Sequence, residues 1–250
     1  QLDLPSRAAA AIDHALVQID RAQAAGTQLA ALLGANPPAS PTDIDSLAQV
    51  AAIFDDSPPH GEALGDPTRL PAIERDATQL ATLTNTRARA LARVRARYDE
   101  GLFALDLDGL AARFQKLARA FFLLAWWGLR GARKALRTVA RDGRLPASIE
   151  IADDLEKARA ARDSATELAR MEPRGREIFG SMWNGTESDA TALDRALTWS
   201  SELRRLLNAA RPGLFGARVQ PSGGYVGAAN EARAQLAELR TSLTNLGELL

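Results

Sequence analysis

Pairs of carboxylates are the residues of this chain that could carry acid–base or metal chemistry. They occur at Asp55-Asp56, Asp99-Glu100, Asp106 with Asp108, and Asp153-Asp154. Neighbouring carboxylates can transfer protons or hold a divalent cation. At helix ends, however, carboxylates more often cap the helix or remain solvated. We therefore predict no catalytic residue and no metal site at these positions.

The sequence contains few residues suited to other catalytic or cofactor chemistry. The chain has no cysteine, and its two histidines are His14 and His60. This excludes disulfides, thiol nucleophiles and cysteine-based metal sites. Neither a G-x-x-x-x-G-K-[ST] loop nor a G-x-G-x-x-G loop is present, so we expect no cofactor and no ATP bound in the Walker manner. The chain by itself is predicted not to be an enzyme.

A basic segment is the strongest binding signal. Residues 85–144 contain 14 basic and 5 acidic residues, a local charge of +9 in a chain whose formal net charge is zero. A helical wheel places seven cations on one side: Lys116, Arg119, Arg130, Arg133, Lys134, Arg137 and Arg141. The last five are the predicted nucleic-acid contacts. Such a one-sided face suits the phosphate backbone of DNA or RNA. The alternatives are a solvated face, or one paired with Asp153, Asp154 and Glu156.

An aromatic cluster precedes the basic residues. Phe122, Trp126 and Trp127 extend beyond the apolar seam of their predicted helix, so a second apolar face exists there. This face is either buried between neighbouring helices or a docking patch. The partner would be another protein, a second copy, or the rest of a parent protein. A protein-interaction or oligomerisation module without nucleic-acid binding is therefore the second function that the sequence suggests.

The elements that must position these residues are helices. Alanine, leucine, arginine and glutamine dominate, and alternating β-branched runs do not occur, which predicts an all-α fold. The zero net charge excludes a chain-wide polybasic binder. The longest apolar run, Ala120 to Leu129, is half of the roughly 20 residues that a bilayer requires. No signal peptide is visible, so we expect a cytoplasmic protein that does not enter a membrane.

Caps and apolar spacing predict eight helices. Ile12, Leu16, Ile19, Leu29 and Leu32 recur near helical spacing in the first helix, and Ser40 is expected to cap the second. A single helix is expected from Asp108 to Arg141, paired antiparallel with the following helix in a coiled-coil-like hairpin. Thr186 is expected to cap the seventh helix. The other predicted ranges are 6–33, 72–98, 148–171, 174–183, 186–210 and 227–250.

We expect an elongated helical bundle in three parts. Residues 1–100 would form an N-terminal helical region, and residues 101–210 the long hairpin with the helices that follow it. Residues 211–250 would contribute a loop and a C-terminal helix that packs back. The loop from Asp55 to Pro71 is rich in proline and glycine, which is typical of a boundary.

Several motifs between Asp106 and Leu207 resemble a known family. They are Leu105-Asp106-Leu107-Asp108, Phe121-Phe122-Leu123-Leu124, Arg133-Lys134-Ala135-Leu136, Ile151-Ala152-Asp153-Asp154-Leu155, Ile178 to Gly185 with Glu187-Ser188-Asp189, and Ala196-Leu197-Thr198-Trp199. This pattern resembles the helical insertion of large bacterial superfamily I helicase-like (AAA-type) ATPases. The family has an aromatic after the matching Asp, where this chain has Ala190. The resemblance implies an accessory part of a DNA- or RNA-dependent ATPase and transfers no catalytic residue.

Overall fold

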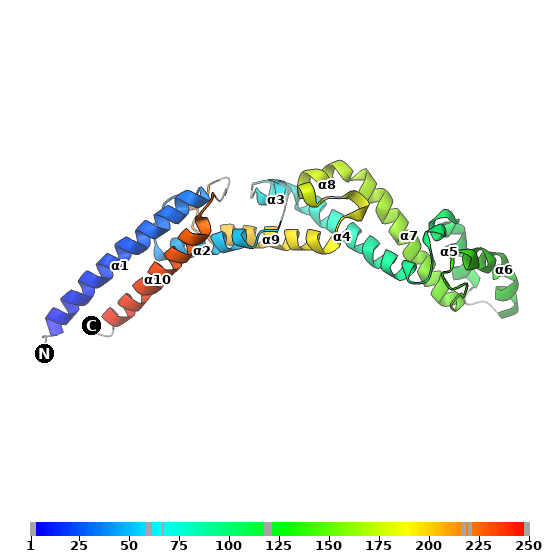
Figure 1. Cartoon of the computed structure of the whole chain (residues 1–250), viewed down its shortest axis with the longest axis horizontal. Helices are drawn as coiled ribbons and strands as arrows, with labels where there is room; N and C mark the ends of the chain where they lie inside the picture. The colour runs from blue at the N-terminus through cyan, green and yellow to red at the C-terminus, as the bar shows by residue number, and fades with distance from the viewer. Residues whose placement is uncertain are drawn as a thin grey trace. The chain divides into compact units, whose positions relative to one another are not determined.

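The computed structural model describes residues 4–58, 62–66, 68–117, 122–216, 219 and 222–247. These residues form α-helices and short 3-10 helices without a β-strand, so the prediction of an all-α fold is confirmed (Figure 1). The α-helices are α1 (Leu4–Leu33), α2 (Pro41–Asp55), α3 (Glu62–Gly65), α4 (Leu70–Arg95), α5 (Leu107–Leu117), α6 (Phe122–Val139), α7 (Ser148–Arg170), α8 (Glu172–Phe179), α9 (Ala190–Ala209) and α10 (Tyr225–Gly247). Three 3-10 helices join them: η1 (Glu100–Ala104), η2 (Gly180–Met182) and η3 (Gly185–Glu187).

The chain divides into two compact units that alternate along the sequence. Unit 1 comprises Gln1–Glu74, Ile178–Ser181 and Arg195–Leu250, and unit 2 comprises Arg75–Glu177 and Met182–Asp194. The sequence prediction divided the chain at residues 100 and 210 instead. Three stretches of chain build unit 1, so its core depends on contacts between residues that are far apart in sequence.

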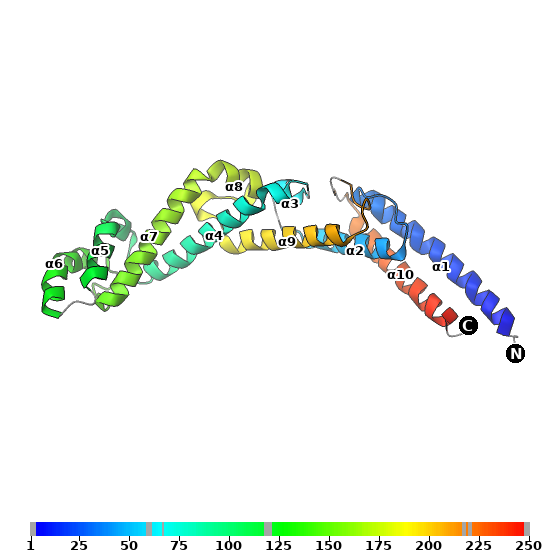
Figure 2. The ribbon, with the colours of Figure 1, turned by 180° about the vertical axis from the view of Figure 1, so that it is seen from behind.

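Unit 1 is organised around α1 and α10, which lie side by side, with the start of α1 and the end of α10 at the same end of the pair (Figures 1 and 2). At one end of the pair the His14 ring nitrogen Nδ1 lies 3.1 Å from Ser242 Oγ. At the other end the Ser222 N–H donates to the Leu32 carbonyl at 2.8 Å. The two helices are therefore antiparallel, and α2 packs on both of them.

The predicted apolar repeat of α1 is buried in its second half and exposed in its first. Leu29 is fully buried and Leu32 packs against the core, whereas Ile12, Leu16 and Ile19 are 44%, 54% and 38% exposed. The buried face consists mainly of small residues and belongs to the same core as the alanines of α10. Small side chains allow helix axes to approach closely. A wheel weighted by hydrophobicity ranks isoleucine and leucine above alanine and so does not identify this alanine face. The buried residues of α1 that belong to this core are Ala22, Ala25, Leu29, Ala30 and Leu33.

The start of α2 agrees with the sequence prediction. Ser40 has an extended backbone and its hydroxyl accepts the Asp43 N–H at 3.2 Å, with Pro41 at the first helical position. Asp43 is buried and accepts the Ala39 N–H at 2.8 Å and Arg211 Nε at 3.0 Å. Burial acts to raise the pKa of Asp43, but these hydrogen bonds and the Arg211 charge hold it below its ordinary value. The Asp43 carboxylate therefore links α2 to the segment after α9.

The predicted single helix from Asp108 to Arg141 is wrong, because α5 and α6 fold against each other within unit 2. Phe114 of α5 and Leu136 of α6 are both fully buried in one core, together with Ile151 and Leu155 of α7. In one straight helix Phe114 and Leu136 would lie about 33 Å apart along the axis. Packing the two segments against each other buries both apolar faces at once. Helix α7 packs closely on α5.

Helix α9 begins later than the sequence predicted. Thr186 lies in η3, and Asp189 caps α9 instead, since its Oδ1 accepts the N–H of Thr191 at 2.9 Å and of Ala192 at 3.3 Å. Both residues satisfied the sequence rule for an N-cap. The backbone of Gly185 has a φ of +56°, which glycine adopts without strain, and this turn moves the helix start to Ala190.

Candidate nucleic-acid interface

The predicted basic residues do share one face of α6 and the turn after it. Lys134 and Arg137 are exposed, and Arg133 is half-buried. Leu129, Ala132 and Leu136 are buried on the other side of the same helix. Spacings of three and four residues therefore separate an apolar side from a cationic side, as a helix requires. Arg130 and Arg141 extend the cationic side at either end, and both are exposed.

These cations differ in their partners from Arg93 and Arg97, which pair with carboxylates. Arg133 Nη1 donates to the Ser148 hydroxyl at 3.1 Å, and Arg141 Nε donates to the Tyr98 carbonyl at 3.3 Å. Both partners are uncharged. Within the described ranges, Lys134 and Arg137 form no ion pair. Lys134 and Arg137 thus keep charge that no neighbouring carboxylate of the described chain neutralises.

The carboxylates that could have neutralised α6 are bound to α4 and to the turn after it instead. Asp154 is 1% exposed and accepts Arg93 Nε at 3.1 Å and Arg97 Nη1 at 2.9 Å. Asp153 also pairs with Arg93, at 2.7 Å. Hydrogen bonds and charge from Asp154 raise the pKa of Arg97, so this guanidinium stays ionised. The alternative that Asp153 and Asp154 pair with the basic face of α6 is therefore wrong.

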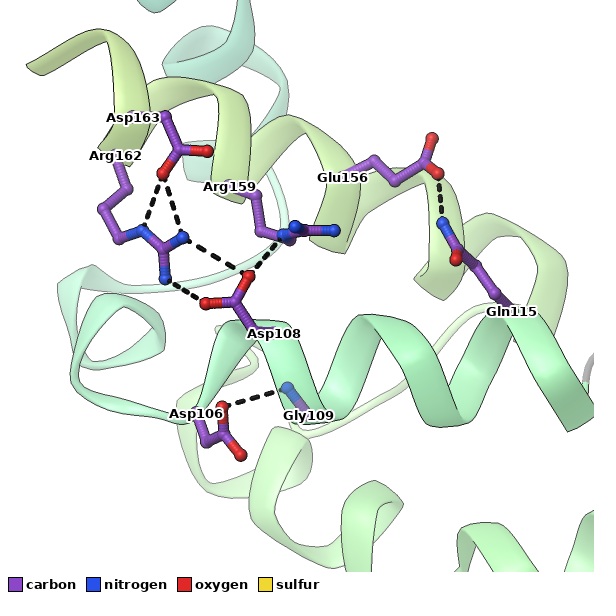
Figure 3. A network of polar contacts seen from close by, with 8 residues as sticks. All are labelled: Asp106, Asp108, Gly109, Gln115, Glu156, Arg159, Arg162 and Asp163. Atoms are coloured by element: carbon purple, nitrogen blue, oxygen red, sulfur yellow. Dashed lines mark hydrogen bonds and ion pairs between the residues drawn. The ribbon is translucent and has the colours of Figure 1, made fainter. Parts of the chain in front are cut away.

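A second ion-pair network fixes the start of α5 against α7 (Figure 3). Asp108 forms ion pairs with Arg159, at 2.7 Å from its Nε, and with Arg162, whose Nη1 donates to the carboxylate at 2.9 Å. Hydrogen bonding by Arg162 lowers the pKa of Asp108. Asp106 accepts the Gly109 N–H at 2.9 Å, and Glu156, which the sequence offered as a partner for the basic helix, bonds to Gln115. Asp106 and Asp108 are therefore engaged in a cap and in ion pairs.

The remaining candidates for acid–base or metal chemistry have similar surroundings. Asp99 accepts the Gly101 N–H at 2.8 Å, Glu100 pairs with Arg95 at 2.8 Å, and Asp56 is the C-cap of α2. No group of three or more histidine and carboxylate side chains that could hold a metal ion occurs in the described part of the chain. His60 lies outside the described residues, and His14 contacts Ser242.

A hollow of about 360 Å³ opens beside the end of α6. Its walls include three arginines, Arg97, Arg141 and Arg144, together with the Asp142 carboxylate. Arg144 was missed in the sequence analysis because it lies beyond the predicted helix, where a wheel no longer applies. Its position three residues after Arg141 was the one sequence feature that could have assigned it to the basic face. The hollow extends the cationic side of α6 into the following turn.

The predicted docking patch cannot be placed in the same way. Phe122, Trp126 and Trp127 belong to α6, whose backbone the structure describes at these positions. It does not describe their side chains. The structure therefore leaves this patch as a prediction from sequence.

Comparison with protein-family models, with curated proteins and with solved structures found no match. No helix among the described residues is both long and apolar enough to cross a membrane.

Proposed function

We propose that this chain is a non-catalytic helical accessory module that binds nucleic acid through the cationic side of α6. The observation that carries the proposal is the contrast in partners: Arg93 and Arg97 pair with Asp153 and Asp154, whereas Lys134 and Arg137 pair with no carboxylate in the described chain. Unpaired, exposed cations on one helix face are free to exchange counterions for phosphates.

The charge of unit 2 supports the same proposal. Unit 2 has 21 basic and 17 acidic residues, although the whole chain is neutral. A positive unit attracts a polyanion before contact and accelerates association. Contacts from Arg130, Arg133, Lys134, Arg137 and Arg141 would go to phosphates, so binding should show little sequence preference.

The proposed setting is a helicase-like ATPase, for which the sequence motifs described above are the support. In that setting the module would hold or guide a strand while another part of the protein hydrolyses ATP. The proposal includes a cytoplasmic location, where such enzymes meet their nucleic-acid substrates.

The decisive experiment is a salt series of binding to labelled single-stranded and duplex DNA and RNA. Five phosphate contacts on duplex DNA predict that log K falls with log salt at a slope of about −4.5. Replacing Arg133, Lys134 and Arg137 by glutamate should weaken binding strongly and reduce the slope to about −1.8.

A matched control separates the local face from net charge. Arg7, Arg21 and Arg195 are exposed residues of unit 1 and form no ion pair in the described chain. Their replacement by glutamate changes net charge by the same amount and should leave the slope unchanged. Equal losses from both triple variants would contradict the assignment to α6. Absence of binding at low salt would favour the protein-docking function, which Trp126→Ala tests directly.

A further inference from the structure

Helix α1 carries a row of large aliphatic side chains that face solvent. Ile12, Leu16 and Ile19 are 44%, 54% and 38% exposed, and their spacing of four and three residues keeps them on one side of the helix. Few large aliphatic side chains are exposed elsewhere in the described chain. Single exposed aliphatics are ordinary, whereas a row at heptad spacing is typical of a helix-packing seam.

Further along α1, the same side of the helix is already covered by a helix. Gly26 lies seven residues after Ile19 and therefore on the same face. A Cβ atom at Gly26 would lie 2.8 Å from Ile44 Cγ1 of α2 and 3.0 Å from Pro38 Cγ. Helix α2 thus occupies the second half of a seam whose first half is open. Leu243, one turn before the end of α10, is also exposed, at 45%.

Acidic residues border the open half of the seam. Asp13 and Asp20 directly follow Ile12 and Ile19, on the side of α1 turned away from the face buried against α10. Both carboxylates are exposed, and neither forms an ion pair in the described ranges. Two copies of α1 packed antiparallel about Leu16 would bring Asp13 of one copy towards Asp20 of the other. This like-charge contact disfavours a second copy as the occupant.

We propose that the open seam of α1 binds an amphipathic α-helix of another protein, with basic residues flanking its apolar row. The partner helix would continue the packing that α2 begins, with apolar residues against Ile12, Leu16 and Ile19. Its lysines or arginines would lie beside Asp13 and Asp20. Helix-in-groove recognition of this kind places anchors at positions i, i+3 or i+4, and i+7.

The test uses two synthetic peptides of about three heptads. Both carry leucine at positions a and d; one has lysine and the other has glutamate at positions e and g. Like charges at these positions oppose pairing of each peptide with itself. Fluorescence anisotropy measures their binding to the full chain. We expect the lysine peptide to bind more tightly than the glutamate peptide.

Two asparagine variants separate the seam from the rest of α1. Leu16→Asn should weaken binding of the lysine peptide by about tenfold or more, because it removes one buried leucine contact. Val17→Asn is the matched control: Val17 is 47% exposed on the other side of the helix, and its replacement should change affinity by less than about twofold. The double variant Asp13→Asn/Asp20→Asn should bring the affinities of the two peptides closer together.

Three outcomes of the peptide experiment would overturn the proposal. They are failure of the lysine peptide to bind, equal affinity for both peptides, and equal losses from the Leu16 and Val17 variants. Sedimentation velocity on the chain alone provides the remaining check. Self-association that Leu16→Asn abolishes would assign the seam to a second copy and exclude the basic partner. Since each substituted side chain is exposed, circular dichroism should show unchanged helicity.

Discussion

The two compact units bury their helices by different means. In unit 1, α1 and α10 meet through alanines such as Ala22, Ala25, Ala229 and Ala232. In unit 2, larger side chains such as Tyr98 and Phe114 fill the core, and arginine–carboxylate networks tie α4 and α5 to α7. Unit 1 has 10 basic and 14 acidic residues, whereas unit 2 has 21 and 17.

This difference explains what each unit leaves on its surface. Close packing through small residues uses the alanine face of α1, so Ile12, Leu16 and Ile19 remain exposed. Networks of ion pairs consume the carboxylates of unit 2, so Lys134 and Arg137 remain without one in the described chain. The first unit thus presents an apolar surface with acidic borders, and the second presents a cationic one.

The largest predicted effect breaks the close packing of unit 1. Gly26→Leu places a side chain where Ile44 and Pro38 already lie, so α2 must move away from α1. We expect a loss of about 3 kcal/mol in the free energy of unfolding. Denaturation by urea, followed by circular dichroism, measures it. A variant as stable as the parent would show that the two helices are not held in contact at Gly26.

The next prediction breaks the ion network of unit 2. Asp154→Ala leaves Arg93 and Arg97 without their buried acceptor, and should reduce stability by about 2 kcal/mol because both arginines keep partial contact with water. Asp153→Ala is the control, since Asp153 is 42% exposed and should contribute less than about 1 kcal/mol. If both variants lost the same free energy of unfolding in urea denaturation, burial of the Asp154 ion pairs would make no extra contribution to stability.

Alkaline pH tests the core of unit 2 from another direction. Burial and the nearby Asp154 charge raise the pKa of Tyr98 to about 12. The hydroxyl of the unfolded chain ionises near pH 10, so the contribution of Tyr98 is complete below that pH and is lost as the pH rises towards 12. We expect stability to fall by roughly 1 kcal/mol between pH 9 and 11.

The Tyr98→Phe variant isolates this contribution, because phenylalanine does not titrate. The variant should lose less stability than the parent over the same pH range. Absorbance of tyrosinate at high pH gives an independent measure of ionisation. Ionisation of Tyr98 near pH 10 in the folded protein would contradict the buried position of its ring.

The smallest predicted effect concerns Gly131 of unit 2, whose surroundings differ from those of Gly26 in unit 1. Within the described chain, a Cβ at Gly131 in α6 would have no atom within 4 Å other than its chain neighbours and its own helix backbone, unlike at Gly26. Gly131→Ala should therefore raise stability by about 0.5–1 kcal/mol, because alanine loses less backbone entropy in a helix. Thermal and urea denaturation measure the gain. A destabilised variant would show that this part of α6 is more closely covered than its exposure indicates.

Much of the local structure could be predicted from sequence. The cap of α2 at Ser40 and the span of α7 depend on residues close together in the chain, and both agree with the structure. The one-sided arrangement of Arg133, Lys134 and Arg137 follows from helical periodicity alone. The start of α9 was missed because Thr186 and Asp189 both fit a cap, and only the turn at Gly185 decides between them.

The candidate sites depended on contacts that periodicity does not encode. The sequence determined that the chain is helical, because helix formation depends on propensities, caps and interactions between residues three or four apart. Tertiary structure decided that α5 and α6 fold together, that α1 buries alanines in place of isoleucines, and that Asp154 pairs with α4. Each of these outcomes depends on which distant segment supplies the neighbouring surface, and a residue's own position in the chain does not specify that neighbour.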